Sequence, residues 1–172
     1  MRLVNLFKYI YLRLISANKV AKVLGVKYGN NCHFGTKNFG SEPYLIEIGD
    51  NFKTSYGVQF ITHDGAVHVL RNKFDELKDI DLFAKIIIGN NVFLGLNSII
   101  LQGTIIGNDV IIGAGSVVKG NIESNGVYAG VPAKFICTIE EYLNKNNEHF
   151  VNTKHLNLSD KAKFIKFRFE VI

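Results

Sequence analysis

Residues 86–122, IIIGNNVFLGLNSIILQGTIIGNDVIIGAGSVVKGNI, repeat in steps of six. Every sixth residue is aliphatic, and four of the six residues that directly follow them are glycine. The aliphatic positions are Ile88, Leu94, Ile100, Ile106, Ile112 and Val118. The positions four residues later are small or branched: Val92, Ser98, Thr104, Val110, Ser116 and Ile122. An internal repeat of this regularity sets the architecture of the region that contains it.

A period of six residues fits neither an amphipathic helix nor a strand with one buried face, whose periods are 3.6 and 2. It fits short strands joined by tight corners around a triangular prism, with three hexapeptides in each coil. Glycine suits a corner where a Cβ would clash or where φ must be positive. Each coil buries its inner face only against its neighbours, so both ends need caps. The repeat therefore predicts an all-β solenoid, a parallel β-helix.

The same frame appears earlier in the chain, with these residues at its inward positions: Ile48, Phe52, Thr54, Val58 and Phe60. Residues 39–44 break the step, and residues 64–85 form a charged, irregular insertion between the two regular blocks. A long excursion from a regular solenoid is usually functional rather than structural. We therefore expect one β-helix over residues 26–136, with an inserted loop at 64–85.

The N-terminal segment, residues 1–25, mixes apolar and basic residues. Charged residues interrupt every stretch of apolar residues that would be long enough to span a bilayer. No cleavage site of small residues follows an apolar stretch, as it would in a signal peptide. We therefore expect neither a transmembrane helix nor a signal peptide. One set of apolar residues has helical spacing: Leu3, Leu6, Phe7, Ile10 and Leu14. This spacing predicts an amphipathic helix that caps the core, or alternatively a peripheral helix resting on the inner face of an anionic membrane.

The C-terminal segment, residues 137–172, lacks the repeat. Thr138 to Glu141 has the pattern of a capping box, which predicts a short helix running toward His149. The last residues fit either a helix capped by Ser159 or a strand with alternating apolar and charged residues. The sequence leaves this choice open.

Composition narrows the class of protein. The 172 residues favour a single domain with enough apolar content for a core. A net charge of +5 without a dense basic stripe argues against a nucleic-acid partner. Cys32 and Cys137 are lone cysteines without CxxC spacing, which argues against a disulfide framework and indicates a reducing cytoplasm.

Residues 86–134 resemble the maltose and galactoside acetyltransferase branch of the hexapeptide-repeat acetyltransferase family. Two upstream segments, FGSEPYLIEIGDNF (39–52) and FITHDG (60–65), resemble relatives that modify capsule, O-antigen or other polysaccharide sugars. Together the resemblance covers residues 26–136. It implies a left-handed β-helix and a homotrimer in which acetyl-CoA and a saccharide acceptor meet in the groove between subunits.

His63 is the candidate general base, because it stands where the regular coil ends and the insertion begins. Acetyl transfer needs a group that takes the proton of an acceptor hydroxyl as it attacks the thioester, and a neutral imidazole suits that task. The resemblance implies that a histidine at this place is the base and that attack is direct, in a ternary complex. His68, in the same insertion, is the competing base and a candidate acceptor contact.

Three further residues are candidates for the acceptor site. Glu42 aligns with an acidic residue of the resembling enzymes and could fix the tautomer of His63 and stabilise the imidazolium. Asn38 lies close to the asparagine with which the family binds sugar hydroxyls. Asp64 either orients His63 or makes a turn with Gly65. A solvated carboxylate and a turn asparagine are the structural alternatives for Glu42 and Asn38.

The donor site is expected along the coil, where exposed backbone groups can hold the extended pantetheine arm as a sheet edge holds a strand. The candidate residues are Phe93, Gly95, Leu96, Gly113, Ala114, Lys119 and Lys134. The resemblance places Leu96 and Ala114 along the arm, and a backbone N–H near Gly95 is a candidate donor to the oxyanion. Lys119 and Lys134 either contact phosphate or are solvated surface charges.

The leading function is therefore transfer of an acetyl group from acetyl-CoA to a hydroxyl of a sugar or polysaccharide precursor, without a metal. An amino-sugar N-acetyltransferase is a variant on the same fold. A zinc enzyme that resembles the carbonic anhydrases of this fold would use His33, His63 and His68 as ligands. A scaffold without catalytic activity is the remaining alternative.

Overall fold

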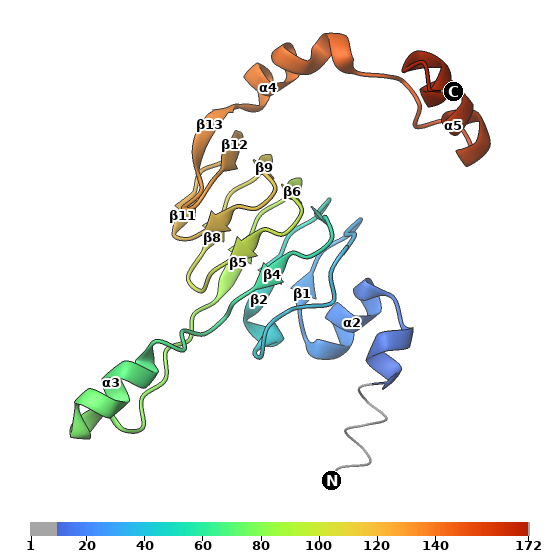
Figure 1. Ribbon diagram of the computed structural model, residues 1–172. Helices are drawn as coiled ribbons and strands as arrows, with labels where there is room; N and C mark the ends of the chain where they lie inside the picture. Colours follow the sequence, from blue (N-terminus) through green and yellow to red (C-terminus); the bar gives the residue numbers. More distant parts are fainter. Residues whose placement is uncertain (1–9, 172) are drawn as a thin grey trace. The chain divides into compact units, whose positions relative to one another are not determined.

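The computed structural model describes residues 10–171 and places the repeat in three sheets, within each of which strands of successive coils lie side by side (Figure 1). The chain divides into two compact units, Met1–Ile139 and Glu140–Ile172. The first unit holds the predicted repeat. None of the helices within the described residues is long and apolar enough to cross a membrane.

The first unit is a three-sided coil. The first sheet contains, in spatial order, β1 (Lys27–Tyr28), β2 (Ile46–Ile48), β5 (Ile86–Ile88), β8 (Ile105–Ile106) and β11 (Asn121–Ile122). The second contains β3 (Lys53–Thr54), β6 (Val92–Leu94), β9 (Val110–Ile112), β12 (Gly126–Ala129) and β13 (Lys134–Thr138). The third contains β4 (Gln59–Phe60), β7 (Ile99–Ile100) and β10 (Val117–Val118). Neighbouring strands of these sheets are parallel, except β12 and β13, which are antiparallel. From β2 to β12, successive strands of the chain belong to the first, second and third sheet in turn.

The register of the coil follows the predicted frame. Ile88 pairs with Ile106, 18 residues further on, as three hexapeptides per coil require. Ile48 pairs with Ile88 across 40 residues, because the insertion lies between them. All inward positions predicted in residues 86–122 are buried, so this part of the prediction is confirmed.

Glycine and asparagine make the corners, which need either close approach of the backbone or a positive φ. A Cβ at Gly95 would lie 2.5 Å from the backbone nitrogen of Ala114 in the next coil, so glycine is needed for close approach. Positive φ angles occur at other corner positions, at glycines such as Gly103 and Gly115, with 75° and 69°, and at asparagines such as Asn91 and Asn97, both with 55°. Asparagine tolerates this left-handed region better than most residues, because its side chain bonds locally.

The N-terminal end of the coil is capped by α2 (Ala17–Leu24). Val20 and Ala21 of this helix are buried in the core. Residues 10–14 are also helical, and the helix is interrupted before α2. The interruption is at Ser16, which has extended backbone and whose side chain accepts a hydrogen bond from the Lys19 N–H.

Within the described residues, the apolar face predicted for the N-terminal helix does not cap the core, and the alternative of a peripheral helix on a membrane stays a prediction. Ile10 and Leu14 are 46 and 80 % exposed, whereas Leu12 and Ile15 pack against the core. Because the helix is interrupted at Ser16, the residues that contact the coil differ from those expected for one continuous helix. Helical spacing of apolar residues does not predict such an interruption. The remaining members of that face, at positions 3, 6 and 7, lie outside the described residues.

Short helices complete the chain. The 3₁₀ helix η1 (Pro43–Leu45) precedes β2, and the insertion contains α3 (Val67–Lys73) and η2 (Asp75–Leu77). The predicted helix toward His149 is α4 (Ile139–Asn146), continued by η3 (Asn147–His149). Of the two alternatives for the last residues, a helix or a strand, the structure shows a helix, α5 (Leu158–Arg168). Its N-cap is Asn157 rather than Ser159.

Candidate functional site

Residues 39–44, which interrupt the hexapeptide frame before β2, place Glu42 beside the start of the insertion. Glu42 precedes Thr62 by 20 residues, the same separation as between the paired His33 and Lys53. Glu42 therefore occupies the position of Thr62 one coil earlier. The carboxylate thus meets Thr62 and His63 through the register of the coil.

The backbone around His63 is fixed by the two ends of the insertion. His63 forms an antiparallel bridge with Phe83. The Asp64 N–H donates to the Leu82 carbonyl at 2.9 Å, and the Ala84 N–H donates to the Thr62 carbonyl at 3.1 Å. The insertion therefore leaves the coil through a short ladder, and His63 is part of that ladder.

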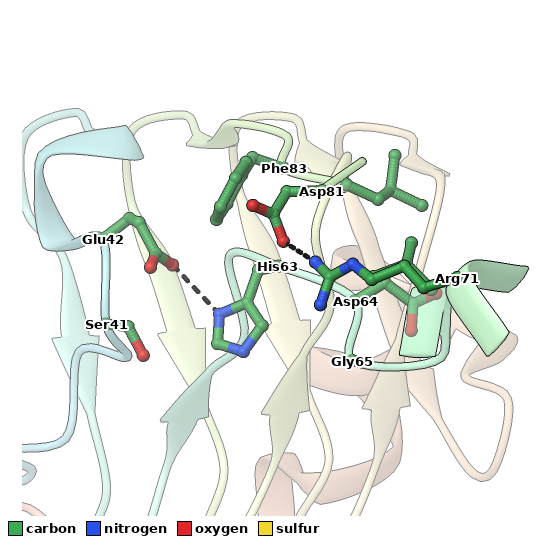
Figure 2. Close-up of a pocket in the computed structure, with 10 residues that line it drawn as sticks. Ser41, Glu42, His63, Asp64, Gly65, Arg71, Asp81 and Phe83 are labelled. Carbon is green, nitrogen blue, oxygen red and sulfur yellow. Dashed lines mark hydrogen bonds and ion pairs between the residues drawn. The ribbon is translucent and has the colours of Figure 1, made fainter. Parts of the chain in front are cut away.

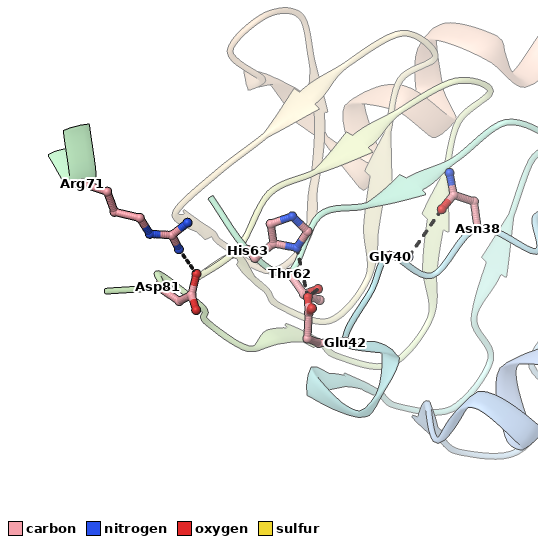
Figure 3. A network of polar contacts seen from close by, with 7 residues as sticks. All are labelled: Asn38, Gly40, Glu42, Thr62, His63, Arg71 and Asp81. Atoms are coloured by element: carbon pink, nitrogen blue, oxygen red, sulfur yellow. Dashed lines mark hydrogen bonds and ion pairs between the residues drawn. The ribbon is translucent and has the colours of Figure 1, made fainter. Parts of the chain in front are cut away.

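His63 and Glu42 form a dyad (Figure 3). His63 Nδ1 lies 3.0 Å from Glu42 Oε2, and the Thr62 hydroxyl donates to the same oxygen at 2.7 Å. An ionised carboxylate can only accept hydrogen bonds, so Nδ1 carries the hydrogen of a neutral imidazole and Nε2 keeps the lone pair. No hydrogen bond to Nε2 is found among residues 10–171. The dyad thus presents a basic nitrogen to its surroundings.

The environment keeps Glu42 ionised. The Thr62 hydroxyl lowers the pKa of Glu42 most, and the hydrogen bond from His63, with its charge when it is protonated, lowers the pKa further, while partial burial acts in the opposite direction. The Glu42 side chain is 16 % exposed and that of His63 is 43 % exposed. The carboxylate is therefore shielded, and the imidazole remains accessible to a substrate.

The dyad lines a hollow of about 380 Å³ at the base of the insertion (Figure 2). Asp64 also lines it, but its Oδ1 accepts a hydrogen bond from the Ala66 N–H at 2.8 Å. This contact corresponds to the turn alternative for Asp64, because the carboxylate holds the backbone beyond Gly65. Across the hollow, Arg71 forms an ion pair with Asp81.

Two predicted acceptor residues lie elsewhere. Asn38 lines a separate hollow with Tyr56, and its side chain accepts from the Gly40 N–H at 3.4 Å. His68 is exposed on α3, where Nε2 lies 3.0 Å from the Asn72 amide nitrogen. The structure does not bring either side chain into the hollow of His63.

The zinc alternative requires three histidines that converge. Within residues 10–171, no group of three or more His, Cys, Asp and Glu side chains is placed to hold a metal ion. His33 forms an isolated bridge with Lys53 of β3, whereas His63 starts the insertion and His68 lies on α3. The proposed ligand set is therefore not assembled.

Four of the predicted donor residues share one corner of the coil. Gly95 lies against Ala114, and the Gly115 N–H donates to the Leu96 carbonyl at 2.7 Å, so Gly95 and Leu96 meet Gly113 and Ala114 one coil later. The Leu96 side chain is 46 % exposed. This donor corner, defined by Gly95, Leu96, Gly113 and Ala114, precedes the strands of the third sheet.

The other three predicted donor residues lie away from that corner. Phe93 is on the outer face of β6, between Lys53 and Ile111 of the neighbouring strands. Lys119 is exposed at the corner after β10, and Lys134 is exposed at the start of β13.

Sequence reasoning missed Thr62, Phe83 and the Arg71–Asp81 pair. Thr62 lies 20 residues after Glu42, whereas the hexapeptide frame gives 18 residues per coil, so the frame did not place it against Glu42. Phe83 and Asp81 stand at the end of the insertion, where no periodicity operates. Only the folded insertion returns them to His63.

Comparisons with known proteins agree with this architecture. A family model described as a hexapeptide repeat of succinyl-transferase matches residues 85–119. The chain is 46 % identical over 169 residues to Protein CapG of Staphylococcus aureus, covering 96 % of each. It is 33 % identical over 129 residues to galactoside O-acetyltransferase of Escherichia coli K12, covering 72 % of this chain and 60 % of the relative.

A solved structure is also similar. The maltose O-acetyltransferase of Clostridium difficile 630 aligns with a TM-score of 0.53 and 25 % identity, covering 72 % of this chain and 84 % of the other. The chain belongs to the hexapeptide-repeat acetyltransferase family. The predicted family and its acetyltransferase class are confirmed.

Proposed function

We propose that this acetyltransferase moves the acetyl group of acetyl-CoA to a hydroxyl of a saccharide or polysaccharide precursor in the cytoplasm. The observation that carries the proposal is the contact of His63 Nδ1 with Glu42 Oε2, which leaves Nε2 with the lone pair on an imidazole that lines a hollow. The names of similar proteins support the acceptor class, since one is a galactoside and another a maltose O-acetyltransferase.

Each group of the dyad has a task in this reaction. His63 Nε2 accepts the proton of the acceptor hydroxyl while the oxygen attacks the thioester carbonyl carbon in a ternary complex. Glu42 holds the imidazole in the required tautomer and stabilises the imidazolium. When the tetrahedral intermediate collapses, the C–S bond breaks and the CoA sulfur receives the proton from His63.

The donor corner suits the pantetheine arm. Gly95 and Gly113 lie against the next coil, where a Cβ would clash, so the exposed residues Leu96 and Ala114 form the surface that a ligand can meet. The Gly95 N–H itself donates to the Ile112 carbonyl at 2.8 Å inside the coil. A donor to the oxyanion therefore has to come from a neighbouring N–H rather than from Gly95.

We infer further that the coil is left-handed and that the chain forms a homotrimer with active sites between subunits. The donor corner precedes the third sheet, whereas His63 follows a strand of that sheet, so one chain holds them at different corners. A neighbouring subunit can bring its donor corner to His63, and its exposed Lys119 or Lys134 to the phosphates. Light scattering should give about three times the chain mass of 19.3 kDa; a monomer mass would contradict the inference.

The direct test incubates the full chain with acetyl-CoA and a panel of glycosides, and follows thiol release. We expect acceptor-dependent CoA release and a product that carries one acetyl group. Mild alkali then separates the two chemistries, because it removes an ester but leaves an amide. An alkali-stable product would establish N-acetylation of an amino sugar, and no release with any acceptor would favour a scaffold.

A further inference from the structure

Phe83 is a large apolar side chain that the fold leaves 49 % exposed inside the hollow of the dyad. Its ring centroid lies 6.2 Å from that of His63, with the ring planes at 63°. Figure 2 shows the ring standing between Glu42 and Asp81, close to the imidazole. The proposed proton transfer does not need an aromatic ring here, so the exposed ring calls for another explanation.

The position of this ring is fixed by the insertion. The backbone of Phe83 is bridged to His63, and on either side of Phe83 the ladder continues through Leu82 and Ala84. Further out, Arg71 Nε donates to the Ile80 carbonyl at 2.7 Å. A ring held on such a ladder is a preformed surface, which lowers the entropic cost of binding against it.

The surroundings of the ring are polar. Asp64 and Asp81 line the same hollow, and the hydrogen bonds and ion pair found for them use only Oδ1 of each carboxylate. The other oxygen of each can accept a hydrogen bond from a ligand hydroxyl. An apolar ring beside acceptor oxygens matches a ligand with one apolar face and a hydroxyl-bearing edge.

A pyranose has this shape, because its axial C–H groups form an apolar face and its hydroxyls project from the rim. We propose that Phe83 determines acceptor specificity: a pyranose ring lies with its C–H face on the Phe83 ring and presents one hydroxyl to His63 Nε2. This inference rests on the proposed function and names the substrate class of the same site. An open-chain polyol has the same hydroxyls but no rigid face to lie on the ring.

The test compares ring and open-chain acceptors in matched pairs. The probes are the methyl pyranosides of glucose, galactose and mannose, each paired with the alditol of the same configuration. The variants are Phe83→Ala, Phe83→Tyr, which keeps the ring, and Phe74→Ala. Phe74 is a matched control, because it is a phenylalanine of the same insertion, 37 % exposed, and lies outside the hollow.

We expect Phe83→Ala to lower kcat/KM for the best pyranoside on the order of tenfold, the size of an aromatic stacking contact. The alditol should change about twofold or less, and the KM for acetyl-CoA should not change. Phe83→Tyr and Phe74→Ala should behave like the parent enzyme. Thermal unfolding of each variant identifies any general loss of structure.

The outcomes separate the two proposals. Unchanged pyranoside kinetics in Phe83→Ala, or an equal loss with the alditol, would overturn the role of Phe83 while the acetyltransferase reaction stands. Absence of CoA release by the parent enzyme with every probe would overturn the proposed function and this inference with it.

Discussion

His63→Ala should lower acceptor-dependent CoA release by about 10²–10⁴-fold, the contribution of a well-placed general base. The expectation follows from the dyad, because Nδ1 is bound to Glu42 and Nε2 keeps the lone pair of an imidazole that lines the hollow. Binding of acetyl-CoA should be unchanged, since the donor corner does not include His63. Steady-state thiol release and calorimetric titration with acetyl-CoA measure the two properties separately.

His68→Ala is the matched control for this prediction. It removes a histidine of the same insertion that is exposed and bonded to Asn72, outside the hollow. We expect its turnover to stay within about twofold of the parent enzyme, as for a surface change away from the reacting atoms. If His68→Ala lost as much activity as His63→Ala, or if His63→Ala kept full turnover, the assignment of the base would be wrong.

The regular part of the fold could be predicted because its constraints are local and repeated. Each coil buries its inner face against the next, so Ile88 and Ile106 obey one rule applied at every step. Periodicity was a poorer guide at the N-terminal helix, where the prediction depended on helical spacing of apolar residues. Whether the helix continues past Ser16 depends on a side-chain cap and on contact with the coil, neither of which appears in a hydrophobic period.

The candidate site could be predicted only where the repeat is interrupted. His63 was identifiable because it stands where the regular frame ends. Its contact with Glu42 depends on a coil that is two residues longer than the hexapeptide frame allows, and this longer coil concealed the register. Phe83 and Asp81 depend on the path of the insertion, which is set by hydrogen bonds between residues distant in sequence.

Glu42→Gln should lower turnover on the order of a hundredfold or more, although its size is nearly unchanged. The carboxylate requires a hydrogen on His63 Nδ1, whereas an amide can also donate to Nδ1 and so permits the tautomer with the hydrogen on Nε2. The amide also stabilises the imidazolium less. Glu47→Gln is the control: Glu47 bonds Lys27 and Lys85 on the first sheet, and its pKa is also lowered.

The pH dependence of stability tests the same carboxylate independently of turnover. The pKa of Glu42 is lower in the folded chain than in the unfolded chain, where it is about 4.3. Ionisation of Glu42 therefore stabilises the fold at pH values above that unfolded pKa. This stabilisation is lost as the pH falls through the folded pKa. The difference in free energy of unfolding between the parent enzyme and Glu42→Gln should therefore shrink from pH 7 to pH values below about 4. Urea unfolding measures it, and a difference that is independent of pH would show that ionised Glu42 does not hold the dyad together.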